Sequence, residues 1–82
     1  RAALARFTKL YADRYAGDGI RMNDVLPGYL DNWEWSETVV GSIPAGRPGT
    51  VEEIAKVVVF LLSDEAQYVT GQGILVDGGL NR

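Results

Sequence analysis

The chain has 82 residues and a mass of 8.9 kDa, and its 8 basic and 11 acidic residues give a formal net charge of −3. A chain of this length forms one domain at most and, folded alone, buries only about 60% of its unfolded surface. It contains no Cys and no His, which excludes disulfides, thiolate or imidazole catalysis, and Cys/His zinc sites within these residues. No metal site is therefore expected.

Basic residues concentrate near the N-terminal end. Residues 1–22 carry five basic and two acidic side chains, whereas residues 23–82 carry three basic and nine acidic ones. A basic stretch can bind nucleic acid, but these charges are interleaved with apolar residues at helical spacing. We expect a solvated helix face, with no nucleic-acid partner. No apolar run approaches a membrane span and no signal peptide is visible, so we expect no membrane partner and a cytoplasmic protein.

The first predicted element is an amphipathic helix over Arg1–Ala16. Apolar side chains recur at steps of three and four residues, and polar ones fill the other faces. No N-cap residue precedes the helix, so we expect the chain to open inside it. The apolar positions are Leu4, Phe7, Tyr11 and Tyr15.

A short strand is predicted next, over Ile20–Leu26, and Pro27-Gly28 ends it because proline cannot continue a central ladder. Asn23 and Asp24 are unfavourable strand residues. We interpret them as hydrogen-bonding to neighbouring backbone near the strand end, with a catalytic role as the alternative.

Residues 28–48 form a connection longer than the ~12–15 residues that normally lack secondary structure. We predict a short helix over Trp33–Gly41 within it. A second helix is predicted over Val51–Leu62, where Thr50 and Glu53 form a capping box. Its last six residues alone are compatible with a buried strand, but the capping box and the length favour a helix.

The last predicted element is a strand over Gly73–Asp77. A strand, a crossover with a helix and a second strand form a βαβ unit, which joins parallel strands. Parallel sheets are buried on both faces, and two strands with two helices are too few to cover one another. We therefore expect this sequence to be the end of a larger domain.

Six motifs in order resemble the C-terminal part of a short-chain dehydrogenase/reductase, and they span essentially the whole chain. They are Ile20-Arg21-Met22-Asn23 leading to Pro27-Gly28, Ile43-Pro44-Ala45-Gly46-Arg47, Val51-Glu52-Glu53-Ile54-Ala55, Phe60-Leu61-Leu62-Ser63-Asp64, Tyr68-Val69-Thr70-Gly71-Gln72 and Val76-Asp77-Gly78-Gly79.

The resemblance implies an α/β fold, the C-terminal part of a Rossmann-type doubly wound parallel sheet with the order helix, strand, substrate loop, helix, strand. Residues 1–82 would be the C-terminal portion of a single NAD(P)-binding domain whose N-terminal portion is absent. The implied activity is hydride transfer between NAD or NADP and a carbonyl, alcohol or C=N substrate, which requires the missing portion. The implied assembly is a homotetramer or homodimer, with the last strand and its preceding helix at one interface.

The resemblance also implies a cofactor-binding role for four residues. Pro27 and Gly28 would end the strand beside the nicotinamide, and Leu30 would line its pocket. Relatives usually have Thr four residues after this glycine, where the present chain has Asn32. An amide can donate and accept a hydrogen bond at that position, and the alternative is a polar turn.

Arg1 stands where the catalytic Lys of the family's Tyr-x-x-x-Lys motif would fall, which makes it the one catalytic candidate in this chain. A guanidinium keeps the positive charge and can donate to ribose oxygens, but it stays protonated and cannot relay a proton. Arg1 is either a genuine replacement of that Lys or an ordinary exposed arginine at a cut end.

Three aromatic residues mark a predicted substrate lid. Tyr29, Trp33 and Trp35 could form an apolar wall for a small-molecule substrate, and the alternative is that they fill gaps in packing. Arg47 lies between Gly46 and Pro48, and we interpret it as a structural residue that pairs with a carboxylate at a turn. The rival to an enzyme is a degenerate, non-catalytic reductase or an assembly module.

Overall fold

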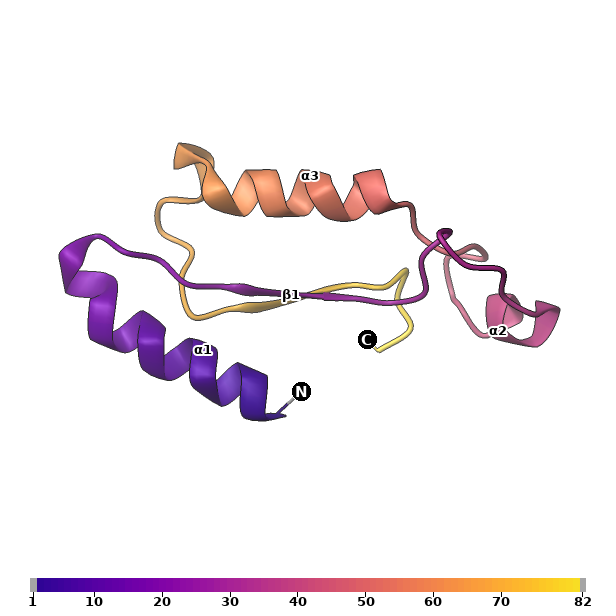
Figure 1. The fold of residues 1–82 in the computed structure, drawn as a ribbon, viewed down its shortest axis with the longest axis horizontal. Coiled ribbons are helices and arrows are strands. Elements are labelled where there is room, and N and C mark those ends of the chain that lie inside the picture. Colours follow the sequence, from indigo (N-terminus) through magenta and orange to yellow (C-terminus); the bar gives the residue numbers. More distant parts are fainter. Residues whose placement is uncertain (1, 82) are drawn as a thin grey trace.

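The computed structural model describes residues 2–81 and contains a two-stranded parallel sheet. Strand β1 (Asp24–Pro27) pairs with β2 (Gly73–Val76) in a register that places Pro27 opposite Val76. Figure 1 shows the helix α3 on one side of the strands and α1 on the other. The predicted parallel βαβ unit is thus confirmed, with a helix against each face of the sheet.

The first strand is shorter than predicted at its beginning and extends one residue further at its end. It starts at Asp24 rather than Ile20 and includes Pro27. The residues before it are held by irregular contacts, because the Met22 N–H donates to the Thr70 hydroxyl rather than to a strand. The second strand ends one residue before Asp77.

Asn23 and Asp24 differ in how they are satisfied. The Asn23 side chain donates to the Val69 carbonyl and accepts from the Gln72 N–H. It bonds to backbone as predicted, but the backbone belongs to a segment distant in sequence rather than to neighbouring residues. The prediction is wrong for Asp24, whose two carboxylate oxygens are buried and have no hydrogen-bond partner among residues 2–81. Asp24 is the first residue of β1, opposite Gly73, and its backbone N–H donates to the Gln72 carbonyl, while its side chain is buried against that pair.

The helix predicted over Trp33–Gly41 is only α2, Glu37–Gly41. It begins where the Ser36 hydroxyl accepts the Val39 N–H as an N-cap. The preceding residues instead form a turn that is closed by a hydrogen bond from the Trp35 indole to the Leu30 carbonyl.

Helix α3 (Val51–Leu62) has the predicted bounds and the predicted capping box at Thr50 and Glu53. Its C-terminal end is held by Arg21, whose guanidinium donates to the carbonyls of Leu61, Ser63 and Val69 at 2.7, 3.3 and 3.3 Å. A short 3₁₀ turn, η2 (Asp64–Ala66), follows.

Helix α1 (Ala2–Tyr15) is confirmed, and another 3₁₀ turn, η1 (Ala16–Asp18), follows it. It contacts the rest of the chain through small residues. Thr8 and Ala12 are its buried residues, and the methyl of Ala12 lies 3.4 Å from where a Cβ on Gly71 would stand. Its large apolar residues remain exposed (Leu4, Phe7, Leu10 and Tyr11).

The chain buries a small core for its size. Its accessible surface of 6131 Å² exceeds the roughly 4,800 Å² of a compact protein of this mass, and its radius of gyration of 14.7 Å exceeds the expected value of about 12 Å. Within the part of the chain that the structure describes, four hydrophobic side chains form the buried core: Ala12, Ile43, Leu61 and Ala66. Among residues 2–81, no helix has the length and apolar character to cross a membrane.

Candidate functional site

The carboxyl ends of both strands meet at one edge of the sheet. There the Gly28 N–H donates to the Val76 carbonyl at 3.1 Å, directly after the last ladder pair. A Cβ on Gly28 would stand 2.7 Å from the Cβ of Asp77 and 3.0 Å from its Cα. Glycine is therefore required for the ends of the two strands to approach so closely at this point.

The segment after Gly28 is bonded to the loop that enters α3. The Gly49 N–H donates to the Tyr29 carbonyl at 2.9 Å, and the Gly49 carbonyl accepts from the Asp31 N–H at 2.8 Å. These two bonds form an isolated parallel bridge that places Leu30 opposite Gly49. A Cβ on Gly49 would lie 3.4 Å from the Leu30 side chain, so the absence of a side chain there lets Leu30 pack closely.

The three predicted lid residues separate into a pair and a single exposed residue. The rings of Tyr29 and Trp35 pack edge to face with centroids 4.5 Å apart, and the Trp35 indole N–H donates to the Leu30 carbonyl at 2.7 Å. The side chain of Trp33 is 70% exposed. Tyr29, Leu30 and Trp35 thus form one rigid cluster, and Trp33 stands outside it.

An open hollow lies beyond the end of β1, lined by Asp31, Asn32, Trp33 and Glu34. Asn32 makes no side-chain hydrogen bond within the part of the chain that the structure describes, so its amide is available to donate and to accept. No group of three carboxylates among residues 2–81 is arranged to hold a metal ion.

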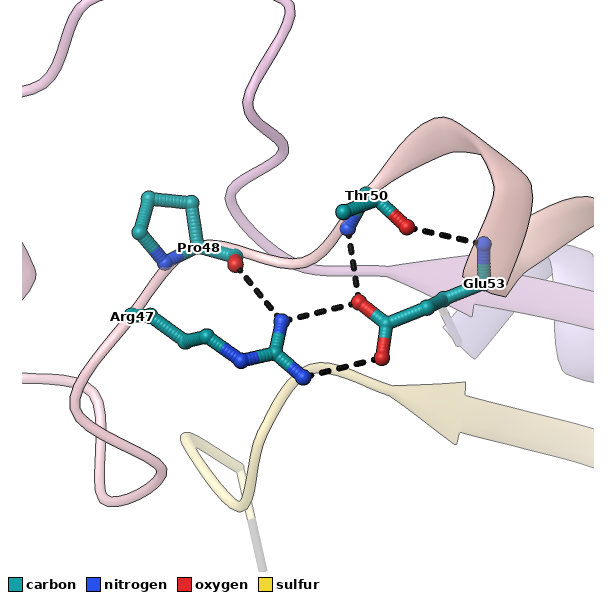
Figure 2. A network of polar contacts seen from close by, with 4 residues as sticks. All are labelled: Arg47, Pro48, Thr50 and Glu53. Atoms are coloured by element: carbon teal, nitrogen blue, oxygen red, sulfur yellow. Dashed lines mark hydrogen bonds and ion pairs between the residues drawn. The ribbon is translucent and has the colours of Figure 1, made fainter.

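Figure 2 shows the polar network at the start of α3, where the Arg47 guanidinium lies against the Glu53 carboxylate. The guanidinium donates one hydrogen bond to each carboxylate oxygen of Glu53, at 2.8 and 2.9 Å, and a third to the Pro48 carbonyl at 3.1 Å. Glu53 also accepts the Thr50 N–H at 2.9 Å. The predicted pairing of Arg47 with a carboxylate is confirmed.

These contacts shift the pKa values of both partners. The hydrogen bonds from Arg47 and then from the Thr50 backbone lower the pKa of Glu53 to about 2. The same hydrogen bond to Glu53 raises the pKa of Arg47 above its usual value. Both groups therefore stay charged throughout the physiological range.

Asp77 closes the turn after β2. Its carboxylate accepts the backbone N–H groups of Gly79 and Asn81, each at 3.0 Å, and the Asn81 side-chain amide at 3.1 Å. Burial acts to raise the pKa of Asp77, but the hydrogen bonds from Asn81 and Gly79 outweigh it, so the pKa is lowered. A charged Asp77 thus keeps the turn folded beside Gly28.

The structure brings together most of the residues predicted for the site. Pro27, Gly28 and Leu30 lie at the carboxyl edge, with Asn32 in the adjoining hollow. Arg1 lies outside the described residues. Gly49 is a site residue that the sequence motifs do not predict, because its partners lie about twenty residues earlier in the chain. Its one signal in the sequence is its place between Pro48 and the capping box.

Comparison with known proteins agrees with this arrangement. A sequence model of the family described as enoyl-(acyl carrier protein) reductase matches residues 1–81. The 3-oxoacyl-(acyl-carrier-protein) reductase FabG of Thermotoga maritima is 44% identical, in an alignment that covers 98% of this chain and 35% of that protein. Cyclohexanol dehydrogenase of an Acinetobacter strain is 48% identical, over 87% of this chain and 30% of that protein.

A crystal structure of a short chain dehydrogenase from Bacillus anthracis superposes with a TM-score of 0.90 at 36% sequence identity, covering 99% of this chain and 33% of that one. This superposition and the two parallel strands with a helix against each face define the chain as the C-terminal part of a Rossmann-type α/β fold. The chain belongs to the short-chain dehydrogenase/reductase family. It spans about a third of the length of the relatives that it matches.

Proposed function

We propose that residues 1–82 form the C-terminal portion of a single NAD(P)-binding domain, and that the full-length protein is an NAD(P)-dependent oxidoreductase. It transfers hydride between the cofactor and a carbonyl, alcohol or C=N substrate. The observation that carries this proposal is the close approach of Gly28 to Asp77 at the carboxyl edge of two parallel strands. Ligands of open α/β sheets bind outside this edge.

The residues at the edge fit the nicotinamide end of such a cofactor. A carboxamide requires one donor and one acceptor, and the side-chain amide of Asn32 supplies both from the rim of the hollow. Pro27 and Gly28 present a strand end without bulky side chains, and Leu30 supplies an apolar contact. When bound, the nicotinamide supplies or accepts the hydride.

The aromatic cluster favours a small-molecule substrate with an apolar part. Tyr29 and Trp35 are fixed against each other and against the Leu30 carbonyl, so they form a rigid wall and exclude water from one side of the site. Trp33 is exposed at the hollow and is the residue we assign to the moving part of the lid.

Arg1 is assigned an electrostatic role toward the cofactor ribose. A guanidinium remains protonated, so it can hold ribose oxygens and stabilise a nearby anion, but it cannot pass on a proton. The proton that accompanies hydride transfer would then come from a residue in the N-terminal portion.

The names of the relatives support the proposed type of reaction. One is named as a reductase of 3-oxoacyl groups and another as a dehydrogenase of cyclohexanol. Both names describe the interconversion of a carbonyl and an alcohol.

The full-length protein should be titrated with NADH and with NADPH, with binding followed by coenzyme fluorescence. We expect saturable binding of at least one of them, and we expect Asn32→Ala to weaken it by about threefold to thirtyfold through loss of one or two hydrogen bonds. Gln67→Ala, an exposed amide at the opposite end of the sheet, is the control and should change nothing. Failure of the unaltered protein to bind either coenzyme would favour the degenerate, non-catalytic alternative.

We further propose a cytoplasmic homotetramer or homodimer that binds neither nucleic acid nor membrane. Support comes from α3, whose outer face exposes large apolar side chains, with Val59 65% and Leu62 78% exposed. A second copy of the chain would cover such a face by an isologous contact.

A further inference from the structure

The loop that carries the candidate site is joined to the Arg47–Glu53 pair through the backbone of Pro48–Thr50 and a series of hydrogen bonds. We call residues 28–35 the site loop. We propose that Arg47 is a positioning residue for the site loop: its paired contact with Glu53 fixes Gly49, and Gly49 fixes the backbone on either side of Leu30. This inference rests on the proposed function, because the loop is the part that would contact cofactor and substrate.

The first step is the closed ring that Arg47 makes with Glu53. The two-pronged contact, the bond from Arg47 to the Pro48 carbonyl and the bond from the Thr50 N–H to Glu53 enclose residues 47–53 (Figure 2). A planar guanidinium can satisfy both carboxylate oxygens and the carbonyl at once, whereas an ammonium has no fixed fork. The ring therefore holds the backbone at Gly49 in one conformation.

The second step leads from Gly49 into the site loop. Gly49 donates to the Tyr29 carbonyl and accepts from the Asp31 N–H at 2.9 and 2.8 Å, so one residue binds the loop on both sides of Leu30. The next bond is from the Trp35 indole to the Leu30 carbonyl at 2.7 Å. A displacement of the ring would therefore reach Trp35 through consecutive short contacts.

The third step is that the pair lies at the surface. The side chains of Arg47 and Glu53 are 58% and 41% exposed, and pairs of this kind contribute little to global stability. The contact between Arg47 and Glu53 is nevertheless bidentate, and the backbone that it encloses is bonded to the site loop. The consequence of breaking it is thus expected in the site loop and not in the overall fold.

The test uses the full-length protein labelled with fluorotryptophan, with the signals of Trp33 and Trp35 assigned by their Phe variants. We expect Arg47→Gln to move the fluorine signal of Trp35, to leave that of exposed Trp33 in place, and to weaken NADH or NADPH binding by about threefold to tenfold. The number of binding sites per chain should not change. Arg47→Lys should give a smaller effect of the same kind.

Glu52→Gln is the matched control, because it removes a carboxylate from the same helix turn and leaves the Arg47–Glu53 pair intact. It should change neither the fluorine signal of Trp35 nor the dissociation constant of the coenzyme. A purely structural role would lower the number of binding sites and leave the dissociation constant unchanged, which would overturn the proposal. An unmoved Trp35 signal in Arg47→Gln would also overturn it. If the unaltered protein binds neither coenzyme, the proposed function fails separately, and the Trp35 signal alone decides on the positioning role.

Discussion

The carboxyl edge of the sheet and the two long helices are held by different kinds of interaction. At the carboxyl edge of the sheet, directed hydrogen bonds join residues 28–31 to residues 47–53, and others close the turn over residues 77–81. On the helices, by contrast, α1 and α3 carry large apolar side chains of which most remain exposed. The edge is therefore locally complete, whereas the helix layers lack the surfaces that would cover them.

This difference shows which parts of the chain are held by contacts within residues 2–81 and which are not. The hydrogen bonds at the edge have both donor and acceptor among residues 2–81, within the turns and between residues 29–31 and Gly49, so they need no partner from outside. Burial of apolar area needs partners on the other side. We infer that the site edge is preformed and that α1 and α3 need further apolar contacts, which a second copy would supply at the exposed face of α3.

The largest effect is expected from a charge on the uncovered face of α3. In the full-length protein, Val59→Asp would bury an unpaired carboxylate if a second copy covers this face, at a cost of several kcal/mol of assembly free energy. Light scattering should then show a smaller assembly. Gln67→Asp places the same charge on an exposed turn and should leave the assembly intact. An unchanged mass for Val59→Asp would contradict the use of the α3 face as the contact between copies, and a monomeric unaltered protein would contradict the homo-oligomer proposal.

At the site edge, Gly28→Ala should destabilise the full-length protein by about 1–3 kcal/mol, since the added Cβ would meet Asp77 at 2.7 Å. The strand ends would have to separate. Gly41→Ala is a suitable control because nothing lies within 4 Å of its added Cβ. Urea denaturation measures both, and equal midpoints for the two variants would show that the close approach is unimportant.

Removal of the α3 cap tests the same edge with a smaller effect. Thr50→Ala removes the hydroxyl that accepts the Glu53 N–H at 3.1 Å, and it should cost about 1 kcal/mol of unfolding free energy. Thr38→Ala, on the exposed α2, should change it by less than about 0.5 kcal/mol. If Thr50→Ala lowers the free energy of unfolding no more than Thr38→Ala does, the cap is not formed in solution.

The smallest expected effect concerns the titration of Glu53. The pKa of Glu53 is about 2 when folded, against roughly 4.3 in an unfolded chain, so its stabilising contribution is complete above the unfolded value and disappears as the pH falls through the folded one. Carboxyl-carbon NMR should report this low pKa and a higher one in Arg47→Gln. Identical Glu53 titrations in the two proteins would contradict the bidentate contact.

Helix α3 could be predicted to the residue because its signals are local. The Thr50 hydroxyl and the Glu53 carboxylate lie three residues apart, and their reciprocal bonds define the first turn. The N-cap of α2 at Ser36 is equally local, yet the predicted helix begins at Trp33 and includes Ser36. The indole bond from Trp35 to the Leu30 carbonyl competes with helix formation and is not visible as a pattern of hydrophobicity.

The start of β1 and the face of α1 could not be predicted for a different reason. Arg21, Met22 and Asn23 bond to residues forty or more positions later, which local propensities do not register. On α1, the pattern of large apolar residues predicted the helix, but Thr8 and Ala12 form its buried contact because small side chains permit close approach. In the site, Gly28 could be predicted because it directly follows the end of a strand. Its contact with Asp77 could not be predicted, because it depends on the register of the two strands.

The central claim is that this chain supplies the nicotinamide side of a coenzyme site. The most direct measurement is a titration of the fluorotryptophan-labelled full-length protein with NADH and with NADPH, observing Trp33 and Trp35. The account predicts that one coenzyme shifts both signals in a saturable manner, with one site per chain. Saturable coenzyme binding that leaves both signals unmoved, or no binding of either coenzyme, would contradict it.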